Sequence, residues 1–116
     1  MQKRIARNRR LAILTLLLAM GLSAITAGPA WAHKVNLFAY AEKGIVYTES
    51  YFADGRKVQD GQIQVRDAKD ALVLTGTTDS QGLFSFPVPA QSGDLTIILD
   101  ASMGHKTQFI LKQEDL

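Results

Sequence analysis

Cysteine is absent from this chain of 116 residues. An exported product would therefore carry no disulfide and no lipid attached at a cysteine, and thiol nucleophiles and thiolate metal ligands are excluded. Any metal site must use nitrogen, oxygen or methionine sulfur. Histidine is scarce too, with His33 and His105 as its only two occurrences.

Catalytic motifs are also missing: the sequence contains no Gly-x-Ser-x-Gly, no His-Glu-x-x-His and no phosphate loop. With two histidines and one small domain, we expect no enzymatic activity. From His33 onward the chain has eight basic and eleven acidic residues, a formal charge of −3, and no Lys/Arg run. We therefore expect no nucleic-acid partner, and a domain that tolerates cations better than phosphates.

Residues 1–32 have the three parts of a secretory signal peptide. Five basic residues come first, an apolar run follows at 11–27, and the segment ends in Ala30-Trp31-Ala32 after Gly28-Pro29. Cleavage after Ala32 would export residues 33–116 to the periplasm or another extracytoplasmic space. The alternative is an uncleaved membrane anchor, because a run of 17 residues reaches the low end of a membrane span.

The remaining 84 residues consist of short runs in which apolar and polar side chains alternate, as in half-buried strands. Turn residues separate seven such runs, at 35–40, 45–52, 58–65, 72–76, 83–88, 95–99 and 106–112. No later window has a sustained apolar repeat at helical spacing. We therefore predict an all-β domain, a seven-stranded antiparallel β-sandwich over residues 33–116.

Three local predictions follow from the middle and the end of the chain. The third, fourth and fifth runs, joined by polar turns, predict an antiparallel meander, and Pro87 and Pro89 would place the fifth strand at a sheet edge. The aspartates at positions 54, 67, 70 and 79 are expected to be turn formers. The polar tail at 112–116 is expected to fray.

The middle of the chain resembles the carboxypeptidase regulatory-like and transthyretin-like β-sandwiches. The residues that carry this likeness form two blocks, Gly61-x-Ile63-x-Val65-x-Asp67 and Gly76-x-Thr78-Asp79-x-x-Gly82-x-Phe84-x-Phe86. They cover about a third of the chain and specify a fold far more than a function.

A closer resemblance covers residues 33–111. Residues 32–40, the run Thr48-Glu49-Ser50-Tyr51-Phe52 with Gly55, and residues 101–106 are similar to the small periplasmic component of energy-coupling-factor (ECF) nickel and cobalt transporters. This likeness implies an accessory protein that assists uptake of Ni²⁺ or Co²⁺ and contacts the membrane subunits of the transporter. Members of that family often continue into a Pro/Ala-rich linker and a membrane helix, which this sequence lacks.

The two histidines are the candidate metal ligands. If cleavage exposes His33, its α-amine and Nδ1 could close a chelate ring on one metal ion. Imidazole suits Ni²⁺ and Co²⁺, so His105 would add a third nitrogen if the first strand runs beside the last. The alternatives without metal binding are that His33 only precedes the first strand and that His105 is a solvated loop residue.

Other residues and other functions stay open at this point. Met103 could supply a thioether, as a copper-handling protein would need, but we expect it to fill a gap in the hairpin. Glu49 and Asp100 are possible oxygen ligands, although charged strand residues usually face water. The main functional alternative is an interaction module that binds no metal and docks on a membrane partner through an edge strand.

Overall fold

The computed structural model describes residues 2–25, 34–90 and 93–116. The chain divides into two compact units, Met1–Trp31 and Ala32–Leu116. In the first unit, helix α1 (Gln2–Ile25) contains the basic residues and most of the apolar run. Within the part of the chain that the structure describes, no helix has the combined length and apolar character needed to cross a membrane.

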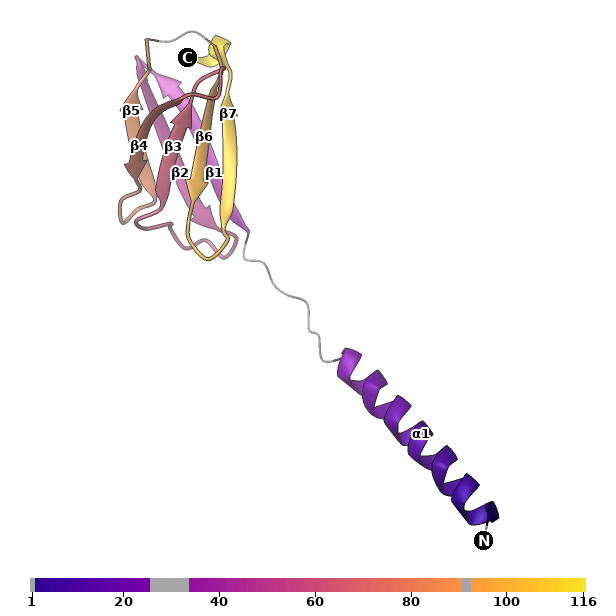
Figure 1. Ribbon diagram of the computed structural model, residues 1–116. Coiled ribbons are helices and arrows are strands. Elements are labelled where there is room, and N and C mark those ends of the chain that lie inside the picture. Colours follow the sequence, from indigo (N-terminus) through magenta and orange to yellow (C-terminus); the bar gives the residue numbers. More distant parts are fainter. Residues whose placement is uncertain (1, 26–33, 91–92) are drawn as a thin grey trace. The chain divides into compact units, whose positions relative to one another are not determined.

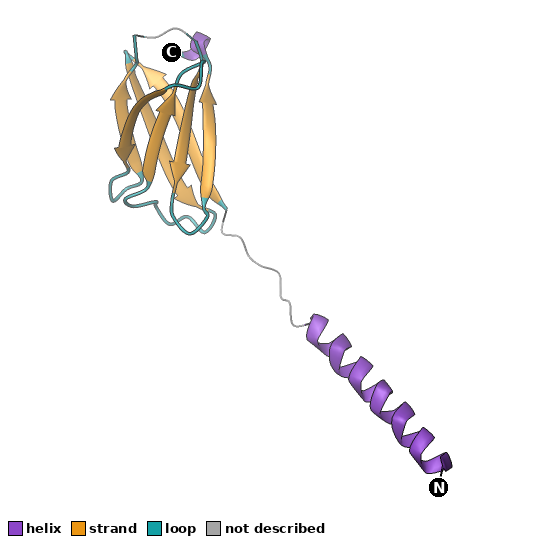
Figure 2. Ribbon diagram, in the orientation of Figure 1, coloured by secondary structure: helices purple, strands orange, loops and turns teal. Residues whose placement is uncertain are grey.

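The second unit consists of seven antiparallel strands in two sheets that do not close into a barrel (Figure 2). One sheet has three strands in the order β1-β2-β5, and the other has four in the order β4-β3-β6-β7. The strands are β1 (Val35–Glu42), β2 (Ile45–Phe52), β3 (Gln62–Arg66), β4 (Leu72–Thr77), β5 (Leu83–Pro87), β6 (Leu95–Asp100) and β7 (Lys106–Leu111). The seven predicted strands and their antiparallel pairing are confirmed.

Figure 1 shows the arrangement of the two sheets. Buried side chains from both sheets form one hydrophobic core. The core is built from strands in which buried and partly exposed side chains alternate. On β6, Leu95, Ile97 and Leu99 are buried while the residues between them are partly exposed. The three-stranded sheet contributes Val46 and Phe86. This unit therefore has a core of its own, as an independently stable domain requires.

Tight turns join the paired strands. Lys43 and Gly44 form the two-residue β1–β2 connection with φ of 50° and 79°, the signature of a type I′ turn. The aspartates act as predicted: the Asp67 carboxylate accepts hydrogen bonds from the backbone of Lys69 and Ala71, and the same pattern occurs at Asp79. Asp70 has φ of 61°, a turn conformation that aspartate tolerates.

The predicted meander is wrong in its third strand. β3 pairs with β4, but β5 leaves that sheet and pairs with β2, where it forms an edge as its prolines predict. Gly76 of β4 faces the ring of Phe84 of β5, and any side chain there would overlap that ring. Phe84 and Phe86 can therefore cover the core from the opposite layer, which they could not do beside β4.

Residues 78–82 connect β4 of the four-stranded sheet to β5 of the three-stranded sheet. The buried Thr78 hydroxyl donates to the carbonyl of Val58 (2.6 Å) and accepts from the backbone N–H of Gly61 (2.8 Å). This buried hydroxyl thus has both a donor and an acceptor as partners close to the sheet junction.

The tail is ordered, contrary to the expectation that it frays. A short 3₁₀ helix, η1 (Gln113–Asp115), follows β7. Asp94 accepts hydrogen bonds from the backbone of Gln113 (2.9 Å) and from Lys112 Nζ (3.2 Å), and Leu116 packs against the core. These contacts offset the chain entropy that would otherwise release a polar end.

Candidate metal site and an exposed aromatic face

His105 lies in the β6–β7 hairpin, directly before β7, and its side chain is half-buried. Its Nδ1 is 3.1 Å from the backbone oxygen of Ser102. A carbonyl oxygen only accepts, so this hydrogen bond requires a proton on Nδ1, and in the neutral ring the lone pair then resides on Nε2. A ring nitrogen that donates to a backbone carbonyl is the usual support of a histidine that ligates metal through its other nitrogen.

The hairpin holds the backbone of His105 in place. The His105 carbonyl accepts from Ala101 N–H (2.8 Å), and its own N–H donates to Ser102 (2.9 Å). Asp100 accepts from the backbone of Ser102 (2.9 Å) and forms an ion pair with Lys106 (3.5 Å). His105 thus projects from a short, hydrogen-bonded loop.

His105 also contacts the β1–β2 strand pair, which lies near the start of the described part of this domain. Its ring meets Phe52 edge to face, with 5.8 Å between ring centroids. Phe52 is the register partner of Val35, and the carbonyl of Lys34 accepts from Ala53 N–H (2.8 Å). His33, the residue before Lys34 in the chain, lies outside the described residues.

The first strand does run beside the last, as the two-histidine hypothesis requires. Phe38 of β1 and Phe109 of β7 meet edge to face at 5.7 Å between centroids, and both strands line one shallow surface hollow. Each strand is an edge of its own sheet. The sequence could not order the strands, so this neighbourhood comes from the tertiary structure.

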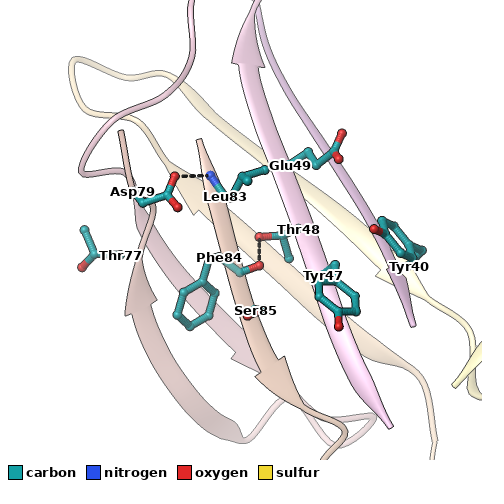
Figure 3. Close-up of a pocket in the computed structure, with 9 residues that line it drawn as sticks. All are labelled: Tyr40, Tyr47, Thr48, Glu49, Thr77, Asp79, Leu83, Phe84 and Ser85. Atoms are coloured by element: carbon teal, nitrogen blue, oxygen red, sulfur yellow. Dashed lines mark hydrogen bonds between the residues drawn. The ribbon is translucent and has the colours of Figure 1, made fainter. Parts of the chain in front are cut away.

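The other proposed ligands are not gathered around His105. Met103 does not fill a gap in the hairpin: 92% of its surface is exposed at the tip, because three successive residues with positive φ turn the loop outward. Glu49 points from β2 toward solvent (Figure 3), and Asp100 is engaged with Lys106. Among the residues the structure describes, no three His, Asp or Glu side chains cluster as a metal site would need.

A second feature, which the sequence interpretation missed, is the outer face of the three-stranded sheet. Phe38, Tyr40, Tyr47, Tyr51 and Leu83 are all exposed there, each by between 37% and 48%. Tyr40 and Tyr47 are register partners, and their rings stack with 5.3 Å between centroids. The even spacing of the aromatic residues at 38 and 40, and at 47 and 51, places each pair on one side of its strand. The sequence does not show which side of the strand is buried, so it could not predict that these residues face outward.

A surface hollow of about 500 Å³ lies along β5 beside this face (Figure 3). Its walls come from β1, β2, β5 and the end of β4, and they consist of Tyr40, Tyr47, Thr48, Glu49, Thr77, Asp79, Leu83, Phe84 and Ser85. Its two charged groups are carboxylates, Glu49 and Asp79. The hollow therefore combines aromatic surface, hydroxyls and negative charge, which are features of a surface that binds a ligand.

Comparison with known proteins identifies no family: no protein-family model, no curated protein and no solved structure matches the chain. What these comparisons and the fold establish together is a small β-rich protein with two antiparallel sheets. The features of the structure that bear on function are therefore the His105 hairpin and the aromatic face.

Proposed function

We propose that the protein is an exported, non-enzymatic accessory domain that assists uptake of Ni²⁺ or Co²⁺ by an ECF-type membrane transporter. Its two sheets would form a sandwich of the carboxypeptidase regulatory-like or transthyretin-like kind. The sequence resemblance over residues 33–111 supports this proposal. One structural observation adds to it: the His105 ring contacts Phe52, the partner of Val35, two residues from His33 in the chain.

The metal ion is cargo in this proposal, and three nitrogens would hold it. Cleavage after Ala32 would create an α-amine next to the His33 imidazole, and both nitrogens can ligate one divalent cation. His105 would supply Nε2, because the proton on Nδ1 is committed to Ser102. Nitrogen ligands of this kind suit Ni²⁺ and Co²⁺ better than Mg²⁺ or Ca²⁺.

Calorimetric titration of Ni²⁺ and Co²⁺ into residues 33–116 tests the proposal. We expect binding by the protein that begins at His33 and a large loss when one glycine precedes it, since the added residue moves the amine out of the chelate ring. His105→Ala should weaken binding further, whereas Gln108→Ala, at an exposed position of β7, should leave it unchanged. Equal binding with and without the glycine, or no binding, rejects the chelate.

A second candidate function is favoured by the aromatic face. In this alternative the domain binds no metal and docks on a membrane partner. The double variant His33→Ala, His105→Ala separates the two in a metal-uptake assay with the transporter. Lost uptake supports metal handling by the histidines, and intact uptake supports docking alone.

A further inference from the structure

The two sheets have unlike outer faces. Outward residues of the four-stranded sheet are mixed and contain no aromatic side chain: six are glutamine or threonine, three are charged and three are apolar, namely Gln62, Gln64, Thr75, Thr77, Thr96, Gln108, Arg66, Asp100, Lys106, Leu72, Ile98 and Ile110. Outward residues of the three-stranded sheet are largely aromatic or apolar and include all three tyrosines of the chain. Single exposed apolar side chains, such as Leu72 and Ile110 on the four-stranded sheet, need no explanation, but the contiguous aromatic group on the three-stranded sheet indicates an interaction surface.

The aromatic face is already arranged for binding in the free domain. Tyr40 and Tyr47 are held opposite each other by the β1–β2 ladder, and Phe38 adjoins Tyr40 at 6.0 Å between centroids. Tyrosine has few rotatable bonds, so little conformational entropy is lost when such a surface is covered. A partner would meet a rigid platform and not a loop that must first become ordered.

The charged side chains of strands β1, β2 and β5 and of the hollow are all carboxylates. Strands β1, β2 and β5 contain no lysine or arginine, and their ionisable carboxylates are Glu42 and Glu49, both exposed. Asp79 adds a third carboxylate at the hollow, oriented by hydrogen bonds from Gln81 and Leu83 N–H. Lysines lie at both ends of the face: Lys43 in the β1–β2 turn at one end, and Lys57, whose backbone is bridged to Tyr51, at the other.

We propose that the aromatic face binds a lysine- or arginine-bearing segment of a partner protein. A cationic head group would sit at the carboxylate of Asp79 or of Glu49, which lie on opposite sides of Leu83 (Figure 3), with its aliphatic stem against Leu83. A second cation would lie over the ring of Tyr40 or Tyr47, whose faces carry negative potential. A second copy of this domain fits less well, because the strands of its own aromatic face contain no lysine or arginine to pair with Glu49 and Asp79.

This inference does not rest on metal binding. The His105 hairpin and the aromatic face use different residues, so the calorimetric test and the test below can fail separately. If the domain docks on a transporter, the aromatic face is the surface we assign to that contact, and basic residues are what the transporter should present there.

The test uses residues 33–116 labelled with ¹⁵N and a short peptide of alternating Arg and Ser as the probe. A peptide with Glu in place of Arg controls for backbone binding. We expect amide shift changes on β1, β2 and β5 with the Arg peptide only. Glu49→Gln and Tyr47→Ser should each weaken binding by about tenfold, the range expected when a cation loses a carboxylate or an aromatic face.

Matched variants separate a site from bulk charge. Glu114→Gln, in η1, removes the same charge as Glu49→Gln, and Ile110→Ser removes an exposed apolar side chain from the other sheet; neither should alter binding. The proposal is overturned if Glu114→Gln weakens binding as much as Glu49→Gln, if the shifts map to the four-stranded sheet, or if neither peptide binds. Binding of a neutral oligosaccharide instead, or self-association through the tyrosines, would also overturn it.

Discussion

Ser50 and Gly82 are joined by two hydrogen bonds to a single carbonyl. The backbone N–H of Ser50 and its hydroxyl donate to the Gly82 oxygen at 2.9 and 3.0 Å, and both residues are buried. Gly82 has φ of 73°, and a Cβ there would overlap the Ser50 carbonyl oxygen. The turn into β5 therefore requires glycine for two reasons, backbone conformation and lack of space.

Gly82→Ala should lower the free energy of unfolding by about 3 kcal/mol, since the strained φ adds to the overlap with Ser50. Gly55→Ala is the matched control. Gly55 also has positive φ, 89°, but nothing lies within 4 Å of a Cβ there, so only about 1 kcal/mol should be lost. Urea unfolding measures both, and equal losses would show that the close approach at Ser50 has no energetic weight.

Thr78→Val should cost about 2–4 kcal/mol, because it leaves the carbonyl of Val58 and the N–H of Gly61 buried without a partner. Thr78→Ser retains the hydroxyl and should lose only about 1 kcal/mol. Thr75→Val, at an exposed position of β4, should change stability by less than about 0.5 kcal/mol. If Thr78→Val and Thr75→Val have the same urea midpoint, the two hydrogen bonds of the Thr78 hydroxyl do not contribute to stability.

The ionisation of Asp94 should make the stability of the folded protein depend on pH. Its hydrogen bond from Gln113 N–H, and then its contact with Lys112, lower the pKa of this carboxyl from the ordinary 3.8. Because the folded pKa lies below the unfolded one, the stabilisation is fully present above pH 3.8 and is lost as the pH falls through the folded value.

The comparison with Asp94→Asn isolates that contribution, since asparagine keeps an acceptor for Gln113 but no charge. We expect the wild type to be the more stable protein at neutral pH and its advantage to shrink below pH 3.8. Urea unfolding between neutral and strongly acidic pH measures the difference. An advantage that stays constant over this range contradicts the role of ionisation.

Met103→Asn should raise the free energy of unfolding by about 0.5–1 kcal/mol. Met103 has φ of 51° and is 92% exposed, so asparagine relieves backbone strain while losing almost no packing. Met103→Ala keeps the strain and should bring no gain. A destabilised asparagine variant would mean that the methionine side chain makes contacts that its exposure does not suggest.

The N-terminus of the exported protein should be His33. Trp31 is the only tryptophan in the chain, so cleavage after Ala32 removes it, and the product should lack tryptophan fluorescence. Mass spectrometry of the exported product gives the new terminus directly. A different first residue would remove the α-amine chelate while leaving the aromatic-face proposal intact.

The positions of the strands could be predicted because alternation is a local property. Val35, Leu37 and Ala39, or Leu95, Ile97 and Leu99, show period two without any knowledge of their neighbours. The turns were equally local, since Asp67 and Asp79 cap their own following residues. The order of strands was not local: β5 joins β2 because Phe84 packs on Gly76 across the core.

The candidate site could be predicted only in part. His105 was identified by its rarity, but its neighbour Phe52 is distant in sequence and was not predicted. On β2 a hydrophobicity argument would bury Tyr47 and Tyr51 and expose Thr48 and Ser50, yet the structure does the reverse. The hydroxyls of Thr48 and Ser50 can be buried because the carbonyls of Phe84 and Gly82 accept from them.

By itself, then, the sequence determined an all-β domain of seven antiparallel strands with aspartate and glycine turns, since these depend on residues adjacent in the chain. The tertiary structure alone decided which sheet β5 joins, that β1 lies beside β7, and that the tyrosines face outward. Each of these depends on hydrogen bonds and close contacts between residues far apart in sequence, such as Ser50 with Gly82, which no local pattern encodes.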